Sequence, residues 1–120
     1  MGIGVDIVVE EEDGIHFVKL DGRLDALTTP IVEKKLAKLF EATNKIAIDF
    51  SRVDYLSSAG MRLLLSVTKK MDAKKGRAVF FNMNDDALEI IKMAGFERVL
   101  AIFPTKKEAL KAFRDNKPLT

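Results

Sequence analysis

The sequence predicts an α/β protein: a mixed sheet of four or five strands opened by a hairpin, with about four helices packed largely on one face. Two observations carry this prediction. Stretches with strand-like alternation stand on both sides of Asp13-Gly14, a residue pair typical of a two-residue hairpin turn. Beyond it, short apolar stretches alternate with longer stretches of helical periodicity, which indicates parallel strands joined by right-handed helical crossovers.

The expected strands are short stretches of alternating or continuous apolar residues. In chain order they cover residues 5–10, 15–20, 45–50, 78–81 and 99–103. Asp21-Gly22 is expected to end the second strand, because both residue types favour turns. The third strand reads KIAIDF, which is apolar almost throughout, so we expect it to lie buried in the sheet.

Four stretches between and after these strands place apolar residues on one helical face. They cover about residues 29–44, 57–74, 84–94 and 105–114. In the first helix, Thr29 suits the N-cap and Pro30 suits the first helical position. In the third helix, the periodicity predicts that Leu88, Ile91 and Ala94 face the core.

Length and composition limit the class of protein. With 120 residues, the chain is expected to form one domain over residues 1–120, with a core over about 5–113 and a frayed tail over 115–120. The absence of cysteine excludes disulfides, thiolate zinc sites and cysteine nucleophiles. His16, the sole histidine, is expected to be a strand residue with its hydrogen bonds satisfied. No phosphate-binding glycine loop or G-x-S-x-G motif occurs, so we expect no enzyme activity, metal or cofactor.

The charge pattern argues against nucleic-acid and membrane partners. The net charge is only +2 and basic residues are interspersed with acidic ones, whereas a groove for nucleic acid needs a concentrated basic face.

No apolar stretch approaches the roughly 20 residues that span a bilayer. The N-terminus lacks the cationic start and apolar core of a signal peptide. The expected location is therefore cytoplasmic.

Two adjacent hydroxyl residues, Ser57 and Ser58, stand where the chain passes from strand to helix. A helix start exposes backbone N–H groups and the positive end of the helix dipole, so a phosphate on Ser58 would be stabilised there. Ala59 and Gly60 are small and let another molecule approach closely. The residues thus favour a site that is modified rather than one that catalyses. The simpler interpretation is that Ser58 is only the N-cap of the helix.

The residues around this turn carry a family resemblance. Residues 49–55 read DFSRVDY, residues 57–61 read SSAGM, residues 22–26 read GRLDA, and residues 103–105 read FPT. The first two resemble the signature of the STAS domain, named for sulphate transporters and anti-sigma factor antagonists, in which the turn reads Asp-Ser-Ser/Thr-Gly-Leu. The other two are similar to the family's turn before the first helix and to its close. The resemblance covers roughly residues 5–113.

The resemblance implies roles for individual residues. The serine that is phosphorylated in the family falls on Ser58, and Ser57 is the second choice. Ser57 stands where the family has an aspartate, and Ala59 stands where it has a second hydroxyl. Asp25 matches the family's acidic residue near the phosphorylated turn. Its alternative role is to hydrogen-bond the backbone of its own loop.

The function that the resemblance implies is that of an anti-sigma factor antagonist. Such a protein, when unphosphorylated, binds an anti-sigma factor that is also a serine kinase, and so releases a sigma factor. Phosphorylation weakens this binding, and a serine phosphatase restores it. The expected partner-binding residues belong to the turn, the start of the second helix and the loop before the first: Asp25, Ala26, Thr28, Ser57, Ser58, Ala59, Gly60, Met61 and Arg62.

Two other interpretations stay open at this point. The first is a STAS adaptor that is never phosphorylated and docks in a larger assembly, such as a stressosome-like scaffold or a lipid-transport complex. The departures at Ser57 and Ala59 favour it. The second is a module that binds a nucleotide or another small ligand at the same helix N-terminus, which no phosphate-binding loop supports.

Overall fold

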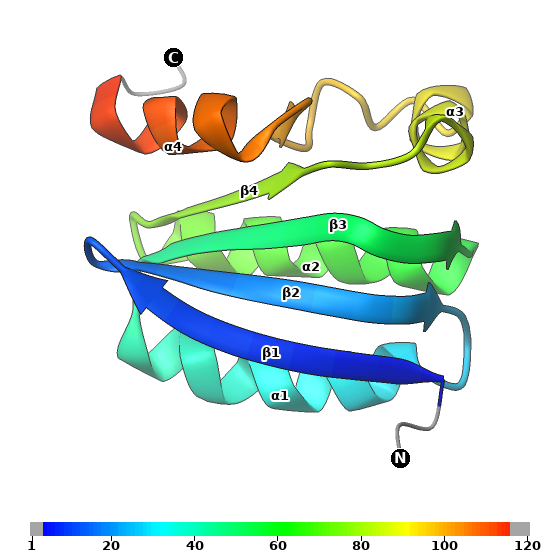
Figure 1. Ribbon diagram of the computed structural model, residues 1–120, viewed down its shortest axis with the longest axis horizontal. Helices are drawn as coiled ribbons and strands as arrows, with labels where there is room; N and C mark the ends of the chain where they lie inside the picture. The colour runs from blue at the N-terminus through cyan, green and yellow to red at the C-terminus, as the bar shows by residue number, and fades with distance from the viewer. Residues whose placement is uncertain (1–3, 116–120) are drawn as a thin grey trace.

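A computed structural model describes residues 4–115 of the protein. They form one β-sheet with helices packed on both of its faces (Figure 1). The strands are β1 (Val5–Glu12), β2 (Ile15–Leu24), β3 (Lys45–Leu56), β4 (Arg77–Phe81) and β5 (Ile102–Phe103). The helices are α1 (Thr29–Ala42), α2 (Ser58–Ala73), α3 (Asp85–Met93) and α4 (Lys106–Asp115). The order of these elements is the predicted one, a hairpin followed by alternating helices and strands.

The sheet is mixed, and its strands lie in chain order. β1 pairs antiparallel with β2, whereas β2–β3, β3–β4 and β4–β5 pair in parallel. At the hairpin, Asp13 and Gly14 have positive φ angles of 54° and 79°, which a two-residue type I′ turn requires. The predicted α/β class, mixed sheet and hairpin are therefore confirmed.

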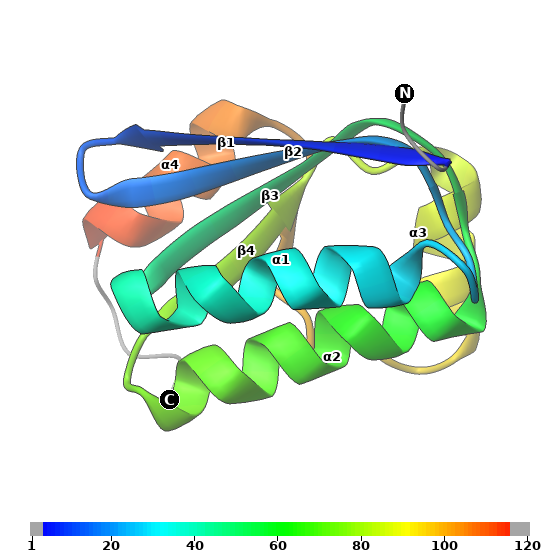
Figure 2. The same ribbon diagram turned by 90° about the horizontal axis from the view of Figure 1, so that it is seen from below.

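Three helices share one face of the sheet. Each crossover moves one strand further in the same direction, so right-handed connections place α1, α2 and α3 together. Their buried residues form the larger core cluster with strand residues such as Ile48 and Phe80. α4 covers the opposite face, where Ala109 and Phe113 pack in a smaller cluster with Phe17. Figure 2 shows α1 and α2 side by side on one side of the strands and α4 on the other.

Two strands are longer than predicted. β2 continues to Leu24, and β3 runs without a break to Leu56. Asp21-Gly22 does not end β2; the register shifts there, and Gly22 adopts a φ of +133°, which favours glycine. The pairing of β2 with β3 therefore continues well beyond Asp49, where the pairing of β3 with β4 ends.

Two element boundaries also differ from the prediction. β5 covers only Ile102–Phe103 instead of residues 99–103, because hydrogen bonds close a turn over residues 96–100. The N-cap of α1 is Thr28 and not Thr29, which is the first helical residue.

The face of α3 that packs against the core differs from the predicted one. Ala87 and Ile91 are buried, whereas Leu88 and Ala94 are exposed. Of the predicted tail, Asp115 is the last residue of α4, and residues 116–120 lie outside the described residues.

Candidate functional site at the start of helix α2

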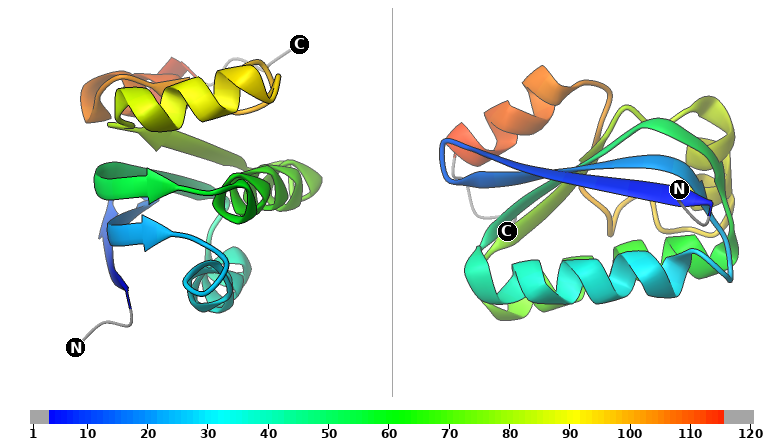
Figure 3. Two further views of the ribbon diagram at one scale, coloured as in Figure 1. Left: turned by 90° about the vertical axis from the view of Figure 1, so that its right-hand side faces the viewer. Right: turned by 60° about the horizontal axis from the view of Figure 1, so that its bottom comes forward.

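The predicted site lies at the edge of the sheet where the parallel strands end. β2 and β3 end there, and α1 and α2 begin there (Figures 1 and 3). The backbone N–H of Ser57 donates to the carbonyl oxygen of Leu24 at 2.8 Å and so joins the ends of the two strands. Parallel α/β sheets commonly bind their ligands at this edge, because the loops that follow the strands converge on it. The fold thus brings together the loop 25–28 and the turn 57–60.

Ser57 is the N-cap of α2. Its backbone is extended, with φ −88° and ψ 174°, and its hydroxyl oxygen accepts the N–H of Gly60 at 3.2 Å. Its carbonyl oxygen accepts the N–H of Met61 at 2.9 Å, which closes the first turn of the helix. The interpretation of Ser58 as the N-cap is therefore wrong. Ser57 is also half-buried, so its hydroxyl is both engaged and partly covered.

Ser58 is the first helical residue, and its side chain is exposed. Among the described residues, its hydroxyl forms no hydrogen bond. Ser58 thus differs from Ser57 in having an exposed hydroxyl without a hydrogen-bond partner among the described residues. The first N–H groups of the helix, with the positive end of its dipole, lie beside Ser58.

Gly60 permits the close approach of α2 to the two strands. A Cβ atom added there would lie 2.8 Å from Leu24 Cβ and 2.8 Å from Leu56 Cδ1, closer than such atoms pack in proteins. Both leucines are at most 1% exposed, so neither can move aside easily. A glycine at this position therefore places the start of α2, and with it Ser58, directly against the ends of β2 and β3.

Asp25 organises the loop between β2 and α1. One of its carboxylate oxygens accepts the backbone N–H groups of Leu27 and Thr28, each at 2.9 Å. The other lies 3.3 Å from Arg23 Nε. The Thr28 hydroxyl accepts the N–H of Asp25 at 2.9 Å and donates to the Arg23 carbonyl at 2.6 Å. The bond from the Thr28 N–H is the main cause that lowers the pKa of Asp25, and the Leu27 N–H, the Thr28 hydroxyl and Arg23 lower it further.

The predicted partner-binding residues divide by exposure. Thr28, Gly60 and Met61 are buried, so they support the surface from beneath and do not form part of it. The remaining residues are exposed or half-buried: Asp25, Ala26, Ser57, Ser58, Ala59 and Arg62. Of the nine predicted residues, only these six present their side chains to solvent, wholly or in part.

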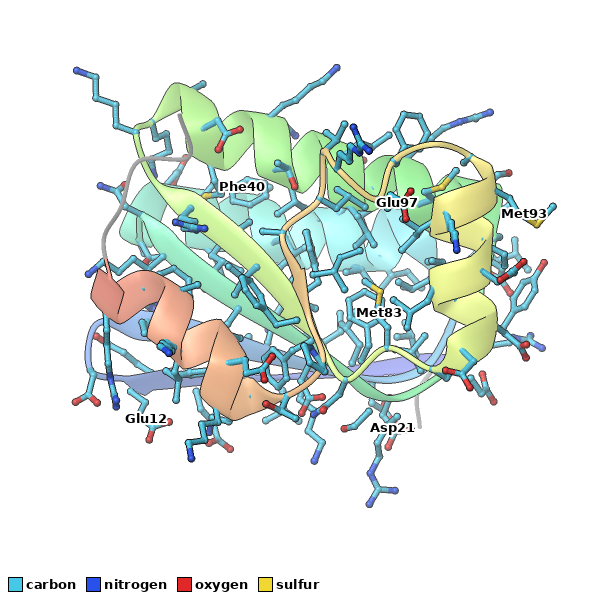
Figure 4. All side chains as sticks on the ribbon, turned by 90° about the horizontal axis from the view of Figure 1, so that it is seen from above. Glu12, Asp21, Phe40, Met83, Met93 and Glu97 are labelled. Atoms are coloured by element: carbon cyan, nitrogen blue, oxygen red, sulfur yellow. The ribbon has the colours of Figure 1, made fainter. Side chains whose placement is uncertain are left out.

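Sequence reasoning missed the apolar residues that surround them. Leu27 is 77% exposed in the loop before α1, Tyr55 is 52% exposed near the end of β3, and Ile31 is 39% exposed in the first turn of α1. α3 lies at the same end of the molecule, and Met93 projects from it into solvent with 79% exposure (Figures 1 and 4). Contiguous exposed apolar area is typical of interaction surfaces, so these residues are candidates for one. In the sequence, the only indication of this exposed apolar area was the position of Leu27 inside a polar loop.

The rest of the described chain offers weaker candidates. His16 is half-buried, and its Nδ1 atom has no hydrogen-bond partner among the described residues, whereas we expected its hydrogen bonds to be satisfied. A cavity of about 180 Å³ beside α4, lined by Lys19, Asp49 and Lys106 among others, is smaller than typical small-molecule sites of about 300–1,000 Å³. Within residues 4–115, no group of three metal-ligating side chains and no helix long and apolar enough to cross a membrane is found.

We compared the sequence with models of known protein families. A model of the STAS domain matches residues 6–109, which is most of the chain. The chain therefore belongs to the STAS domain family, as its sequence motifs predicted.

Several of the similar proteins are named as anti-sigma factor antagonists. The crystal structure of an anti-sigma factor antagonist from Mycobacterium paratuberculosis matches with a TM-score of 0.85 and 26% identity, over 92% of this chain and 95% of that one. The anti-sigma-B factor antagonist of Bacillus subtilis is 24% identical over 102 residues, 85% of this chain and 92% of its own length. SpoIIAA of Bacillus, 20% identical, has been solved unphosphorylated and phosphorylated; the two forms match with TM-scores of 0.76 and 0.69, over 94% and 91% of this chain and 100% of each of those chains.

Proposed function

We propose that this protein is an anti-sigma factor antagonist controlled by phosphorylation of Ser58. The observation that carries the proposal is the exposed, unbonded hydroxyl of Ser58 at the start of α2, beside a serine already engaged as N-cap. The similar proteins described above are named as anti-sigma factor antagonists, and one was solved in a phosphorylated form. The partner is then an anti-sigma factor that is also a serine kinase, and a serine phosphatase reverses the modification.

The replacement of the family's aspartate by Ser57 is compatible with this function. Aspartate and serine are both among the preferred N-cap residues, because each offers an oxygen to the N–H groups of the first turn. Ser57 makes this bond to Gly60. The replacement is therefore compatible with the same conformation of the turn. It removes one negative charge beside the acceptor, and this change affects recognition of the turn by a kinase more than the shape of the turn.

The unmodified surface is suited to a protein partner. Leu27, in the loop after β2, and Tyr55, near the end of β3, offer exposed apolar area close to the joined ends of the two strands. Arg62 adds an exposed cation, and aromatic residues and arginine are the types that contribute most to binding at protein interfaces. Ala59 is small, so a partner can approach the backbone at the start of α2.

A phosphate on Ser58 would change this surface at its centre. It adds a charge of about −1.5 to −2 at neutral pH. In an interface, such a group must lose its water and faces any acidic groups of the partner, and both effects oppose binding. The first turn of α2 offers N–H groups that stabilise the phosphate in the free protein. The modification therefore favours the unbound state.

Binding measurements with purified anti-sigma factor kinases from the protein's own organism test this proposal. Ser58→Asp is expected to weaken binding at least tenfold, about 1.4 kcal/mol, whereas Ser58→Ala leaves it nearly unchanged. Ser51→Asp adds the same charge at an exposed position on β3, away from the turn, and serves as the matched control. Equal binding of the wild type and Ser58→Asp to every such kinase would contradict the proposal and favour the unphosphorylated adaptor.

A further inference from the structure

Arg62 is an exposed cation one helical turn beyond Ser58 on α2. Neither of the two ion pairs found among the described residues involves it. Side chains three or four positions away along a helix are the ones that can pair with it. None of these is acidic: Ser58, Ala59, Leu65 and Ser66. The unmodified protein thus leaves the guanidinium group without an anionic partner on its own helix.

We infer that Arg62 is the intramolecular counter-ion of a phosphate on Ser58, an inference that rests on the proposed acceptor. Residues four positions apart are neighbours on the helix surface. Helical side chains lean toward the N-terminus, so the side chain of Arg62 can reach the turn that carries Ser58. A guanidinium group donates two parallel N–H bonds to two phosphate oxygens. Phosphorylation therefore creates an ion pair within α2 that the unmodified protein lacks.

Other charged groups near the turn are less well placed to take this role. Arg23 already lies 3.3 Å from Asp25, whose carboxylate is bonded to its own loop. Asp54 is exposed near the end of β3 and repels a phosphate. The next basic residue on α2, Lys69, lies about 16 Å from the acceptor along the helix axis, at a rise of about 1.5 Å per residue. At physiological ionic strength this exceeds the screening length of about 8 Å.

The pair has a consequence for the switch. Arg62 is one of the exposed residues of the proposed binding surface. Phosphorylation then changes this surface twice, because it adds an anion and also engages the nearest exposed cation of α2. The phosphate is held over the first turn of the helix instead of moving freely in solvent.

A titration of the phosphate by ³¹P NMR tests the inference. The full chain is made with phosphoserine incorporated at position 58 during translation, so the test requires no kinase. The phosphate pKa is expected to be higher in Arg62→Gln than in the wild-type background by about 0.3 pH unit, the amount that an i, i+4 ion pair supplies. Lys69→Gln removes the same charge from α2 and is expected to leave the phosphate pKa unchanged. Salt at about 1 M is expected to abolish the difference, because it screens exposed charges.

Two results would overturn the inference. One is the same phosphate pKa in Arg62→Gln and in the wild-type background at low salt, with circular dichroism showing both folded. The other is a larger shift in Arg23→Gln than in Arg62→Gln, which would make Arg23 the counter-ion. Neither result depends on whether a kinase modifies Ser58, so a failure of the pair is distinct from a failure of the proposed function, which the binding measurements report.

Discussion

Ser57 and Gly60 hold the turn in place, and this leaves the hydroxyl of Ser58 free. Ser57 uses its side chain to cap α2, and Gly60 lets the helix approach Leu24 and Leu56. The two serines are adjacent in the sequence but differ in role, because the backbone becomes helical between them. Ser57 therefore has a structural role as the N-cap, whereas Ser58 is the acceptor in the proposed function.

The capping role of Ser57 can be tested by stability. Ser57→Ala is expected to lower the free energy of unfolding by about 1 kcal/mol, because the N–H of Gly60 loses its acceptor. Ser57→Asp is expected to restore it to within about 0.5 kcal/mol of the wild type, since aspartate is an equally good cap. Urea unfolding measures both; no loss in Ser57→Ala would show that the cap contributes nothing.

The close approach at Gly60 predicts a steric cost. Gly60→Ala would place a Cβ 2.8 Å from two buried leucine side chains, and relieving this contact is expected to cost about 1–3 kcal/mol of stability. Ser58→Ala, two residues earlier and exposed, is the control and is expected to change stability by less than about 0.5 kcal/mol. Equal stability of the two variants would contradict the geometry described for the turn.

Asp25 predicts a pH dependence. The bonds from the Thr28 and Leu27 N–H groups favour the ionised form, so the pKa of Asp25, read by NMR, is expected below its ordinary value of about 3.9. Its contribution to stability is complete above the unfolded pKa and is lost as the pH falls through the lower folded pKa. Asp25→Asn should therefore be less stable than the wild type near pH 7, and the difference should shrink at low pH. A constant difference across this range would mean that the charge of Asp25 plays no part.

For the helices and strands, the sequence correctly predicted those features that depend on interactions between neighbouring residues. The Asp13-Gly14 hairpin and the order of strands and helices follow from residue types at short spacing, and the structure contains both. The lengths of β2 and β3 did not follow, because Gly22 sits in a register shift that looks like a turn in the sequence. The orientation of α3 depends on its contacts with the sheet, which the helical spacing of its apolar residues did not specify.

At the scale of the whole molecule, the site is a place where separate segments meet. The sequence indicated the turn 57–60 and the loop 25–28, but only pairing of β2 with β3 brings them together. The choice between the two serines required the backbone angles of Ser57, since both residues can cap a helix. The exposure of Leu27 and Tyr55 is likewise a result of tertiary packing.

These two apolar residues should contribute to binding without contributing to folding. Leu27→Ala and Tyr55→Ala are each expected to weaken binding to the anti-sigma factor about tenfold, about 1.4 kcal/mol, because fully burying a large apolar side chain contributes about 1.5–3 kcal/mol. Their unfolding transitions should match the wild type. Val8→Ala, at a 51% exposed position on the edge strand β1, is the control for binding. Unchanged affinity in both variants would place the partner surface elsewhere.

Phosphosite mapping by mass spectrometry, on the protein isolated from its own cells before and after stress, would show directly whether Ser58 is the regulated acceptor. We expect a phosphate on Ser58 whose occupancy changes between the two conditions, and none on the half-buried cap Ser57. Phosphate on Ser57 alone would contradict the assignment of the two serines. An absence of phosphate at both positions under every condition would contradict the switch itself.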